Sequence, residues 1–382
     1  MRLTKDQVRC VWESDRRKDR RQLAIAIAAF VFIFLLCMCF RYQAYSYSDK
    51  FVPLQYFKSI FQGIRFAIAS LIDPVTYSHK QEMIDSIGQV YYGGAWNRLA
   101  ITGMAAVAGA GLAMAGAIFQ TIYKNPMASP NMLGATAGVR LGNILMITLY
   151  STQALELVTR RYVYCYALTA ACVLAVIMLG KLAGDRKGNP SVMKMLMAGS
   201  VISQGLNVFT TYYMYELTDE DLVLYEQMTM GTYTQIDWLS LAIFFGAMAI
   251  AIIPMLMLRY KFNGVAIDYA ESKTSGINPG PIRMIGQICG VIMVTAAMIH
   301  CGDVGMIGMV IPYAVRNAVG ANSKKVLVFS ALFGGMLLMV CRLLTSFFLI
   351  ADEEIPVGFI MSLFMTPAFM IILSKQRRGF EQ

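Results

Sequence analysis

The sequence predicts an all-α protein, a polytopic membrane bundle of about ten transmembrane helices. Two observations lead to this prediction. Hydrophobic residues make up 57% of the 382-residue chain and charged residues only 15%, whereas about a quarter of the residues in soluble domains are charged. Apolar runs such as 22–40, 99–123 and 238–258 also have the length that a helix needs to cross a ~30 Å hydrocarbon core. Because backbone polar groups in lipid must be bonded within their own segment, each run is expected to be a helix.

Ten segments along the chain fit this expectation. All of them are apolar and carry few charges, and the eighth is short and glycine-rich. The first segment is too long for the apolar part of a secretory signal and lacks a small-residue cleavage site, so we expect it to be retained. The expected spans are 22–40, 99–123, 132–150, 162–182, 195–217, 238–258, 282–299, 304–320, 325–350 and 357–374.

The distribution of charge predicts the orientation of these spans. A basic cluster at 16–21 precedes the first span, and lysines and arginines also follow spans two, four, six and eight. The loop 216–237, after the fifth span, instead holds six acidic residues and no basic ones. Basic loops are cytoplasmic by the positive-inside rule. An even number of spans therefore places both termini in the cytoplasm.

We expect one transmembrane domain, at 22–374, with no separate soluble domain. Residues 1–21 form a basic cytoplasmic N-terminus and 375–382 a cytoplasmic tail. The longest loops are an extracytoplasmic segment at 41–97 and a cytoplasmic loop at 259–283. Residues 51–73 have helical spacing, and this helix either caps the bundle or lies on the outer membrane surface.

The composition argues against several classes of function. A net charge of +10 fits basic flanks that meet anionic lipid, so no nucleic-acid partner is expected. The eight cysteines are scattered without a CxxC pair and there are only two histidines, which predicts neither a disulfide framework nor a zinc site. No phosphate-binding GxxxxGK[ST] loop occurs. We therefore expect no enzyme activity in this chain and no catalytic, cofactor-binding or metal-binding residues.

The stretch 98–143 contains two helices rich in small residues, joined by the turn KNPMASPN. Lipid supplies no hydrophobic drive between helices, so a face of small residues permits close packing instead. Pro126 and Pro130 end the first helix and favour an extended turn. The small face of the second span consists of Ala105, Gly109, Ala113 and Ala117.

The segment from Gly109 to Gly142 resembles the FecCD/BtuC-type permeases of ABC importers. In that family a Gly/Ala-rich helix ends in glutamine and is followed by NPLAxPxxLGxxxGAxxG. Here the helix ends at Gln120, and NPMASPNMLGATAGVRLG begins at Asn125. Further blocks follow in the family's order, and the resemblance covers about 90–378. They are Ala198–Gly231 with Asp237-Trp238, Gly302–Arg316 and Glu354–Ala368.

This resemblance implies the membrane-spanning subunit of an ATP-driven importer. The cargo of the family is an iron–siderophore complex, haem or a related chelate or cofactor, moved inward by alternating access. The implied partners are a second permease subunit, in a homodimer or heterodimer, two cytoplasmic ATPase subunits that bind ATP and magnesium, and an extracytoplasmic substrate-binding protein. The implied location is the plasma (inner) membrane of a prokaryote.

In this family the cytoplasmic loop after the sixth span contacts the ATPase. The equivalent residues here are 263–281. Val265–Thr274 is expected to form a short amphipathic helix that stops before Gly276; an ordinary solvated loop is the alternative. The expected ATPase-coupling residues are Val265, Asp268, Ala270, Glu271, Ser272 and Gly276.

The chain departs from the family at the arginines that often meet the binding protein. Of an R-x-x-R pair before the second span, Arg98 is kept and Ile101 replaces the other; a third arginine is replaced by Ser346. We therefore assign docking to Arg98 with Arg160 and Arg161, or to a different partner subunit.

Two further arginines stand where the family is usually apolar. Arg140 lies about eight residues into the third span, and Arg342 near the middle of the ninth. A charge at a helix centre costs about 2.5–3.5 kcal/mol, so each must face a partner, a cavity or water. Each therefore either lines a path for anionic cargo or joins two subunits, or else snorkels or forms an ion pair within the bundle. The other candidates for the pathway or its packing are Gln120, Asn125, Pro126, Gly302, Gly305, Gly308 and Pro312.

Two other functions stay open at this point. A self-contained secondary transporter would show inverted repeats and broken helices, and no convincing repeat occurs here. A degenerate permease that no longer transports, paired with an active one, would explain the missing docking arginines.

Overall fold

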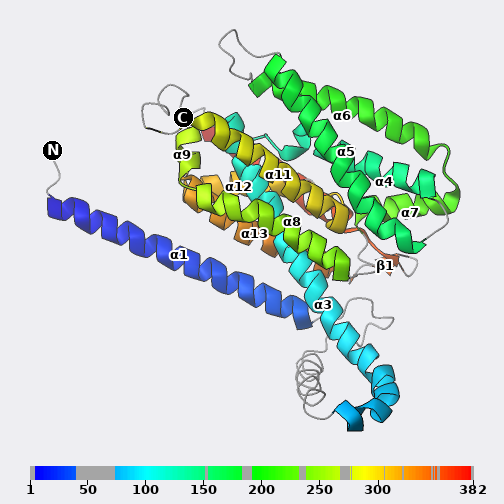
Figure 1. The fold of residues 1–382 in the computed structure, drawn as a ribbon. Helices are drawn as coiled ribbons and strands as arrows, with labels where there is room; N and C mark the ends of the chain where they lie inside the picture. Colours follow the sequence, from blue (N-terminus) through cyan, green and yellow to red (C-terminus); the bar gives the residue numbers. More distant parts are fainter. Residues whose placement is uncertain are drawn as a thin grey trace.

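The computed structural model describes residues 5–39, 74–150, 154–182, 192–231, 238–266, 276, 278–304, 306–320, 322–345, 347, 349–350 and 353–379. Nearly all of these residues are helical, and the long helices lie side by side in one bundle (Figure 1). A two-residue strand, β1 (Leu349–Ile350), pairs antiparallel with β2 (Glu353–Glu354) before the last helix. The prediction of an all-α bundle is therefore confirmed.

Each of the ten predicted spans coincides with one helix. Among the described residues, three shorter helices lie between them: the 3₁₀ helix η2 (Pro130–Leu133), α7 (Asp219–Met230) and α9 (Lys261–Ala266). The ten helices are α1 (Lys5–Cys39), α3 (Pro74–Tyr123), α4 (Ala135–Tyr150), α5 (Ala154–Leu182), α6 (Val192–Met214), α8 (Trp238–Leu258), α11 (Pro279–Cys301), α12 (Ile307–Val319), α13 (Ser323–Thr345) and α14 (Val357–Gly379).

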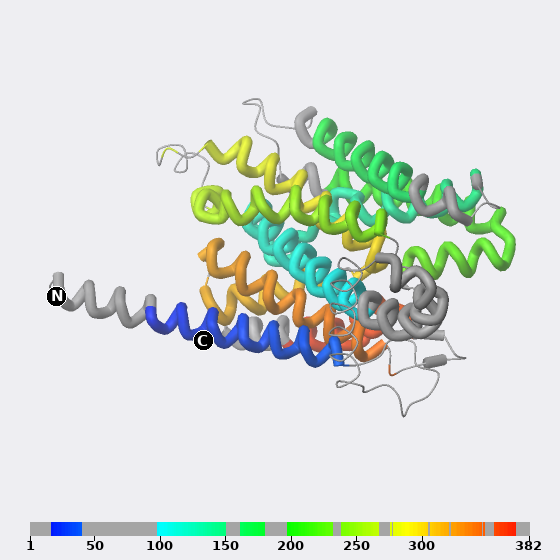
Figure 2. Tube along the Cα trace, turned by 60° about the horizontal axis from the view of Figure 1, so that its bottom comes forward, coloured from blue at the N-terminus to red at the C-terminus, as the bar shows by residue number. Residues whose placement is uncertain are grey.

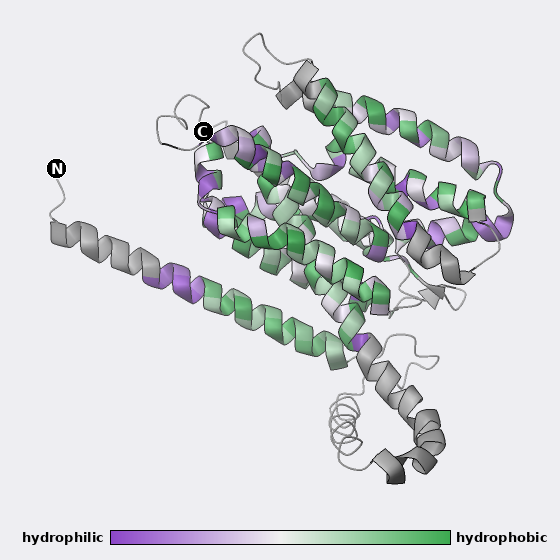
Figure 3. Ribbon diagram, in the orientation of Figure 1, coloured by the Kyte–Doolittle hydropathy of each residue, from purple (hydrophilic) through white to green (hydrophobic). Residues whose placement is uncertain are grey.

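Six of these helices are long and apolar enough to cross a membrane, counting only the described residues. They are the apolar parts of α1, α3, α5, α8, α11 and α13. Apolar segments of α4, α12 and α14 are shorter, at 10–17 residues. In Figure 3, α1 passes from a hydrophilic part to a long hydrophobic part, and hydrophobic residues cover much of α8 and α11. The placement of both termini in the cytoplasm stays a prediction.

Two predicted boundaries differ most from the structure. The second span was expected to begin at residue 99, but α3 begins at Pro74 and runs without interruption to Tyr123. Part of the predicted extracytoplasmic segment 41–97 is therefore a continuation of the span, while its first part, including 51–73, falls outside the described residues. Likewise, α1 begins at Lys5, so most of the basic N-terminus 1–21 is helical and continuous with the first span.

α3 is the central helix of the bundle and contacts α8, α11, α12 and α13. Its predicted small face is the surface that meets α13. A Cβ atom on Gly109 would overlap the carbonyl group of Gly334, and one on Gly334 would overlap Ala113. The two backbones approach this closely because neither glycine carries a side chain, as the spacing of small residues predicted.

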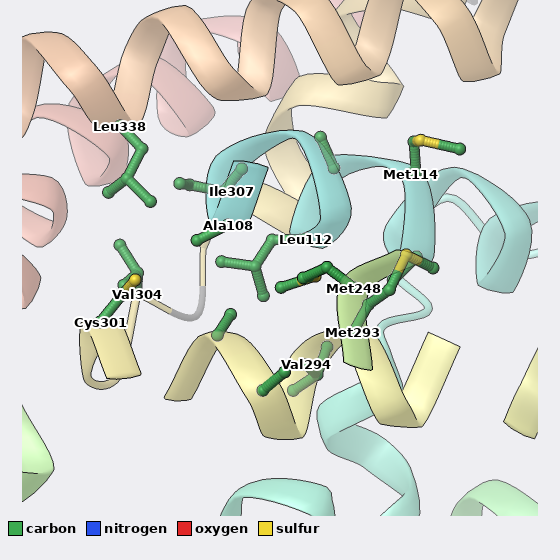
Figure 4. Close-up of a cluster of buried hydrophobic side chains, with 14 of the residues drawn as sticks. Ala108, Leu112, Met114, Met248, Met293, Val294, Cys301, Val304, Ile307 and Leu338 are labelled. Carbon is green, nitrogen blue, oxygen red and sulfur yellow. The ribbon is translucent and has the colours of Figure 1, made fainter. Parts of the chain in front are cut away.

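The other faces of α3 carry larger side chains that fill the interior. Ala108 and Leu112 lie among Met248 of α8, Met293 of α11 and Ile307 of α12, all of them buried (Figure 4). On the outside of the bundle, α1 runs alongside α13 (Figure 2). Interhelical contact in this protein therefore combines backbone approach on one side of α3 with interlocking side chains on the other.

Replacing Gly116 with alanine is expected to lower the thermal unfolding midpoint of the purified protein. A Cβ there would overlap the Gly308 backbone of α12, which cannot turn aside as a flexible side chain can. Overpacking of this kind costs about 1–3 kcal/mol. The matched control is Gly246→Ala in α8, where a Cβ would meet nothing within 4 Å. Unfolding in detergent, followed by size-exclusion chromatography, compares them; equal midpoints would contradict the close contact.

Candidate functional site

The seam between α3 and α12 brings together three of the predicted pathway or packing residues. Pro312 lies within α12 and has no N–H, so it leaves the carbonyl group of Gly308 without its helical partner. That carbonyl points at Gly116 of α3, so closely that only a glycine fits opposite it. One turn further along α3, the buried Gln120 donates a hydrogen bond from Nε2 to the Met309 carbonyl, at 2.9 Å.

Arg316, at the end of the same sequence block, completes this seam. Its Nη2 donates to the carbonyl oxygen of Ala117, at 2.9 Å, and to the hydroxyl of Thr121. A guanidinium group therefore links the last turn of α12 to the C-terminal part of α3. The bonds of Gln120 and Arg316, together with the close backbone approach at Gly308, hold the two helices together. A role of Gln120, Gly308 and Pro312 in the transport path stays a prediction.

The turn after α3 is held by local hydrogen bonds. The side-chain oxygen of Asn125 accepts from the amide of Met127, at 2.9 Å, and its carbonyl oxygen accepts from Ala128, at 3.1 Å. Pro126 lies inside this turn and ends the helix, as predicted from its sequence. Ser129 then caps η2 by accepting from the amide of Asn131.

Arg140 lies in α4 and forms an ion pair with Asp303, which follows α11. Its Nη2 is 2.7 Å from Oδ2 of Asp303, and the two side chains are 37% and 25% exposed. Sequence reasoning did not find this partner, although Asp303 is the only acidic residue between positions 282 and 320. A lone carboxylate beside apolar spans was the available signal. Gly302 precedes it, whereas Gly305 is outside the described residues.

The predicted position of Arg342, near the middle of a span, is wrong. α13 ends at Thr345, so Arg342 lies in the last turn of the helix. Its side chain is 2% exposed, and Nη1 donates to the hydroxyl of Thr345, at 2.6 Å. Free carbonyl groups and the helix dipole favour a cation at this end. This geometry supports a structural role, and a role in the path stays a prediction.

The three docking candidates lie in different surroundings. Arg98 is half-buried in α3, and Arg160 lies in α5 with its side chain outside the described residues. Arg161 is turned into the bundle, where Nε donates to Asn143 Oδ1 and Nη2 to the Met228 carbonyl, each at 3.0 Å. Docking through Arg161 would require these bonds to break. The docking role of all three arginines stays a prediction.

The predicted coupling region is described only at its ends. Val265 was expected to begin the amphipathic helix, but it is fully buried in the preceding helix α9. α9 is tied to α13 because the side-chain oxygen of Asn263 accepts from the amide of Ser323, at 2.7 Å. Gly276 is exposed. The remaining coupling residues are outside the described part of the chain; they are Asp268, Ala270, Glu271 and Ser272.

Basic side chains gather at the same end of the bundle. Tyr260 lies between α8 and α9, with Lys324 Nζ 5.1 Å and Arg259 Cζ 5.2 Å from the centre of its ring. A hydrogen bond from Lys324, and then one from Arg259, lowers the pKa of the Tyr260 phenol below its usual value. The predicted cytoplasmic end is therefore strongly cationic near the coupling region.

The profile of the FecCD transport family matches residues 65–375. The chain therefore belongs to this family of ABC transporter permeases. With its membrane-length helices, it is a multi-pass protein of the prokaryotic inner membrane.

Individual relatives show how far the similarity extends. The chain is 27% identical over 274 residues to an iron chelatin transport system permease protein of Helicobacter pylori, covering 72% of this chain and 80% of the relative. It is 27% identical over 275 residues to the hemin transport system permease protein HmuU of Yersinia pestis, with the same coverage. Among solved structures, a metal-chelate type ABC transporter in an inward-facing conformation superimposes with a TM-score of 0.68 at 21% identity. It covers 94% of this chain and 99% of that chain, so the fold is shared over nearly the whole length.

Arg316→Met is expected to destabilise the bundle, since it removes two hydrogen bonds between α12 and α3. Hydrogen bonds to charged groups contribute about 1.5–3 kcal/mol, so the unfolding midpoint in detergent should fall. Arg17→Met, at an exposed position of α1, is the control. If both variants unfold at the same temperature, Arg316 does not hold the seam.

Proposed function

We propose that this chain is the membrane-spanning subunit of an ATP-driven importer that moves an iron–siderophore or related metal chelate inward by alternating access. The observation that carries this proposal is the FecCD family match over residues 65–375, which includes nine of the ten long helices wholly or in large part. The cargo class follows from relatives named for iron chelatin and hemin transport. We extend that class to this chain because the similarity covers most of its length.

The energy for transport comes from separate subunits in this proposal. Two cytoplasmic ATPase subunits bind ATP and magnesium, a second permease subunit completes the path, and an extracytoplasmic protein delivers the cargo. The contact with the ATPase involves the segment between α9 and α11. The burial of Val265 and the bond from Ser323 to Asn263 anchor one end of this segment to the bundle. When the ATPase displaces this segment, the movement is thereby transmitted to α13.

One sequence feature favours a second candidate function, a partner permease that does not itself transport. Ile101 and Ser346 stand where the family often has docking arginines. A heterodimer in which the other subunit docks the delivery protein would tolerate both changes.

Purification of the chain with its native partners tests the proposed class. An ATPase that co-purifies in stoichiometric amount supports an ABC permease, whether active or degenerate. A chain that purifies without an ATPase and transports down an ion gradient would instead be a secondary transporter, which contradicts the proposal. ATP-dependent uptake by the assembled complex then separates an active permease from a degenerate one.

Gly276→Leu is expected to uncouple ATP hydrolysis from uptake, lowering uptake per complex at least about tenfold. Gly276 has a φ of 75°, so a leucine would strain the backbone of the coupling loop itself. The matched control is Gly320→Leu, at the end of α12. Gly320 has a φ of 85°, and a Cβ at either glycine would meet nothing within 4 Å.

Both variants should insert and assemble normally, because a Cβ at either position has open space around it. Uptake and ATP hydrolysis are measured in the same vesicles and divided by the amount of complex. Equal uptake in the two variants would remove Gly276 from the coupling contact.

A further inference from the structure

The C-terminal end of α7 is bonded to two other parts of the bundle. A helix leaves its last carbonyl groups without partners of its own. Here Arg161 of α5 donates from Nη2 to the Met228 carbonyl, at 3.0 Å. The amide of Asp303 donates to the next carbonyl, that of Thr229, at 2.9 Å. α7 is therefore attached at this end by a side chain from α5 and a backbone amide from the α11–α12 turn.

The attachment through Asp303 lies beside a direct backbone contact between the end of α7 and the α11–α12 turn. A Cβ on Gly231, which ends α7, would overlap Cys301 and Gly302, and one on Gly302 would overlap Gly231. No side chains interlock at these two positions. The position of the turn therefore relies on the two bonds that its next residue makes. The Asp303 amide donates to the Thr229 carbonyl, and the Asp303 side chain forms the ion pair with Arg140 of α4.

The two attachments differ in what surrounds them, although Arg161, Arg140 and Asp303 are all partly exposed. The Arg161 guanidinium also donates to Asn143, a fully buried side chain that in turn accepts from the buried thiol of Cys165. The Arg140 and Asp303 side chains are 37% and 25% exposed. Partly exposed ion pairs contribute only about 0–1 kcal/mol and weaken with salt. The Arg140–Asp303 bond is therefore the one that breaks readily.

We propose that Arg140 and Asp303 are positioning residues that hold the C-terminal end of α7 against the α11–α12 turn, with Arg161 as the fixed attachment. α7 connects the fifth and sixth predicted spans on the predicted outer side, so its position shapes the entrance for cargo. The effect on transport rests on the proposed function, whereas the effect on the position of α7 does not. Arg140 thus acts through α7 and needs no contact with cargo.

Cys301 provides a native reporter for this contact. Its side chain is fully buried and its carbonyl oxygen lies against Gly231. We would replace the other seven cysteines by serine, which keeps a hydrogen-bond donor to Asn143 at position 165, keep the chain in its assembled complex, and measure how fast a water-soluble maleimide alkylates Cys301. Arg140→Gln and Asp303→Asn should each raise this rate at least about tenfold. The exchanged pair, Arg140→Asp with Asp303→Arg, should return it toward the original value.

The matched control is Lys325→Gln, which breaks another ion pair of the same length. Lys325 Nζ lies 2.7 Å from Oδ1 of Asp19, and the side chains are 33% and 39% exposed. This pair joins α13 to α1, so its loss should leave the alkylation of Cys301 unchanged. A rise of equal size in Lys325→Gln and Arg140→Gln would show general loosening and overturn the proposal, as would no rise in Arg140→Gln.

Two further measurements keep the test decisive. In the chain that keeps Cys301 and carries both Arg140 and Asp303, alkylation should be faster at 1 M salt than at 0.05 M, relative to free cysteine, because salt screens the exposed pair. If the alkylation rate of Cys301 does not depend on salt, the Arg140–Asp303 attachment does not open reversibly. This measurement needs no substitution at the ion pair, so it does not depend on whether such a variant folds. Uptake per complex should fall at least about fivefold in Arg140→Gln and recover in the exchanged pair. Normal uptake alongside fast alkylation would overturn the role in transport.

Discussion

The whole bundle depends on close backbone approach along α3. Gly109 meets Gly334 of α13, and Gly116 meets Gly308 of α12, in both cases with a carbonyl group where a side chain would otherwise be. Lipid provides no hydrophobic drive for helices to associate, so stability must come from dispersion contacts and hydrogen bonds at short range. Pro312 adds to this by freeing the Gly308 carbonyl at the point of contact. A helix with larger residues on this face could not pack so closely against α12 and α13 at the centre of the bundle.

The arginines follow from the same constraint, because an apolar interior requires every buried polar group to be bonded. Arg316 donates to α3 and Arg161 to the end of α7, in both cases to backbone carbonyl groups, while Arg140 pairs with Asp303. Each of these three arginines joins its own helix to a segment that is distant in sequence. These charged side chains therefore lie at contacts between segments of the bundle. Such contacts must be stable, yet they must also change when a transporter moves. This arrangement supports a permease whose path is shaped by the positions of its helices.

Much of this architecture could be predicted, because helices are nearly the only structures that lipid permits for long apolar runs. The small face of α3 was also predictable, since a four-residue spacing places Gly109 and Ala113 on one side. The end of α13 was not, because no glycine or proline follows Thr345 directly, and Arg342 was therefore placed too near the middle of its span. The partner of Arg140 lies 163 residues away; the sequence marks Asp303 as a lone carboxylate, but its pairing with Arg140 comes from the tertiary structure.

The most direct test of this account is uptake of a ferric siderophore into liposomes that contain the complete complex. The account predicts accumulation that requires the delivery protein and ATP on the cytoplasmic side, stops with a non-hydrolysable ATP analogue, and is unaffected when ion gradients are collapsed. Accumulation that persists without any ATPase subunit and follows an ion gradient would contradict it.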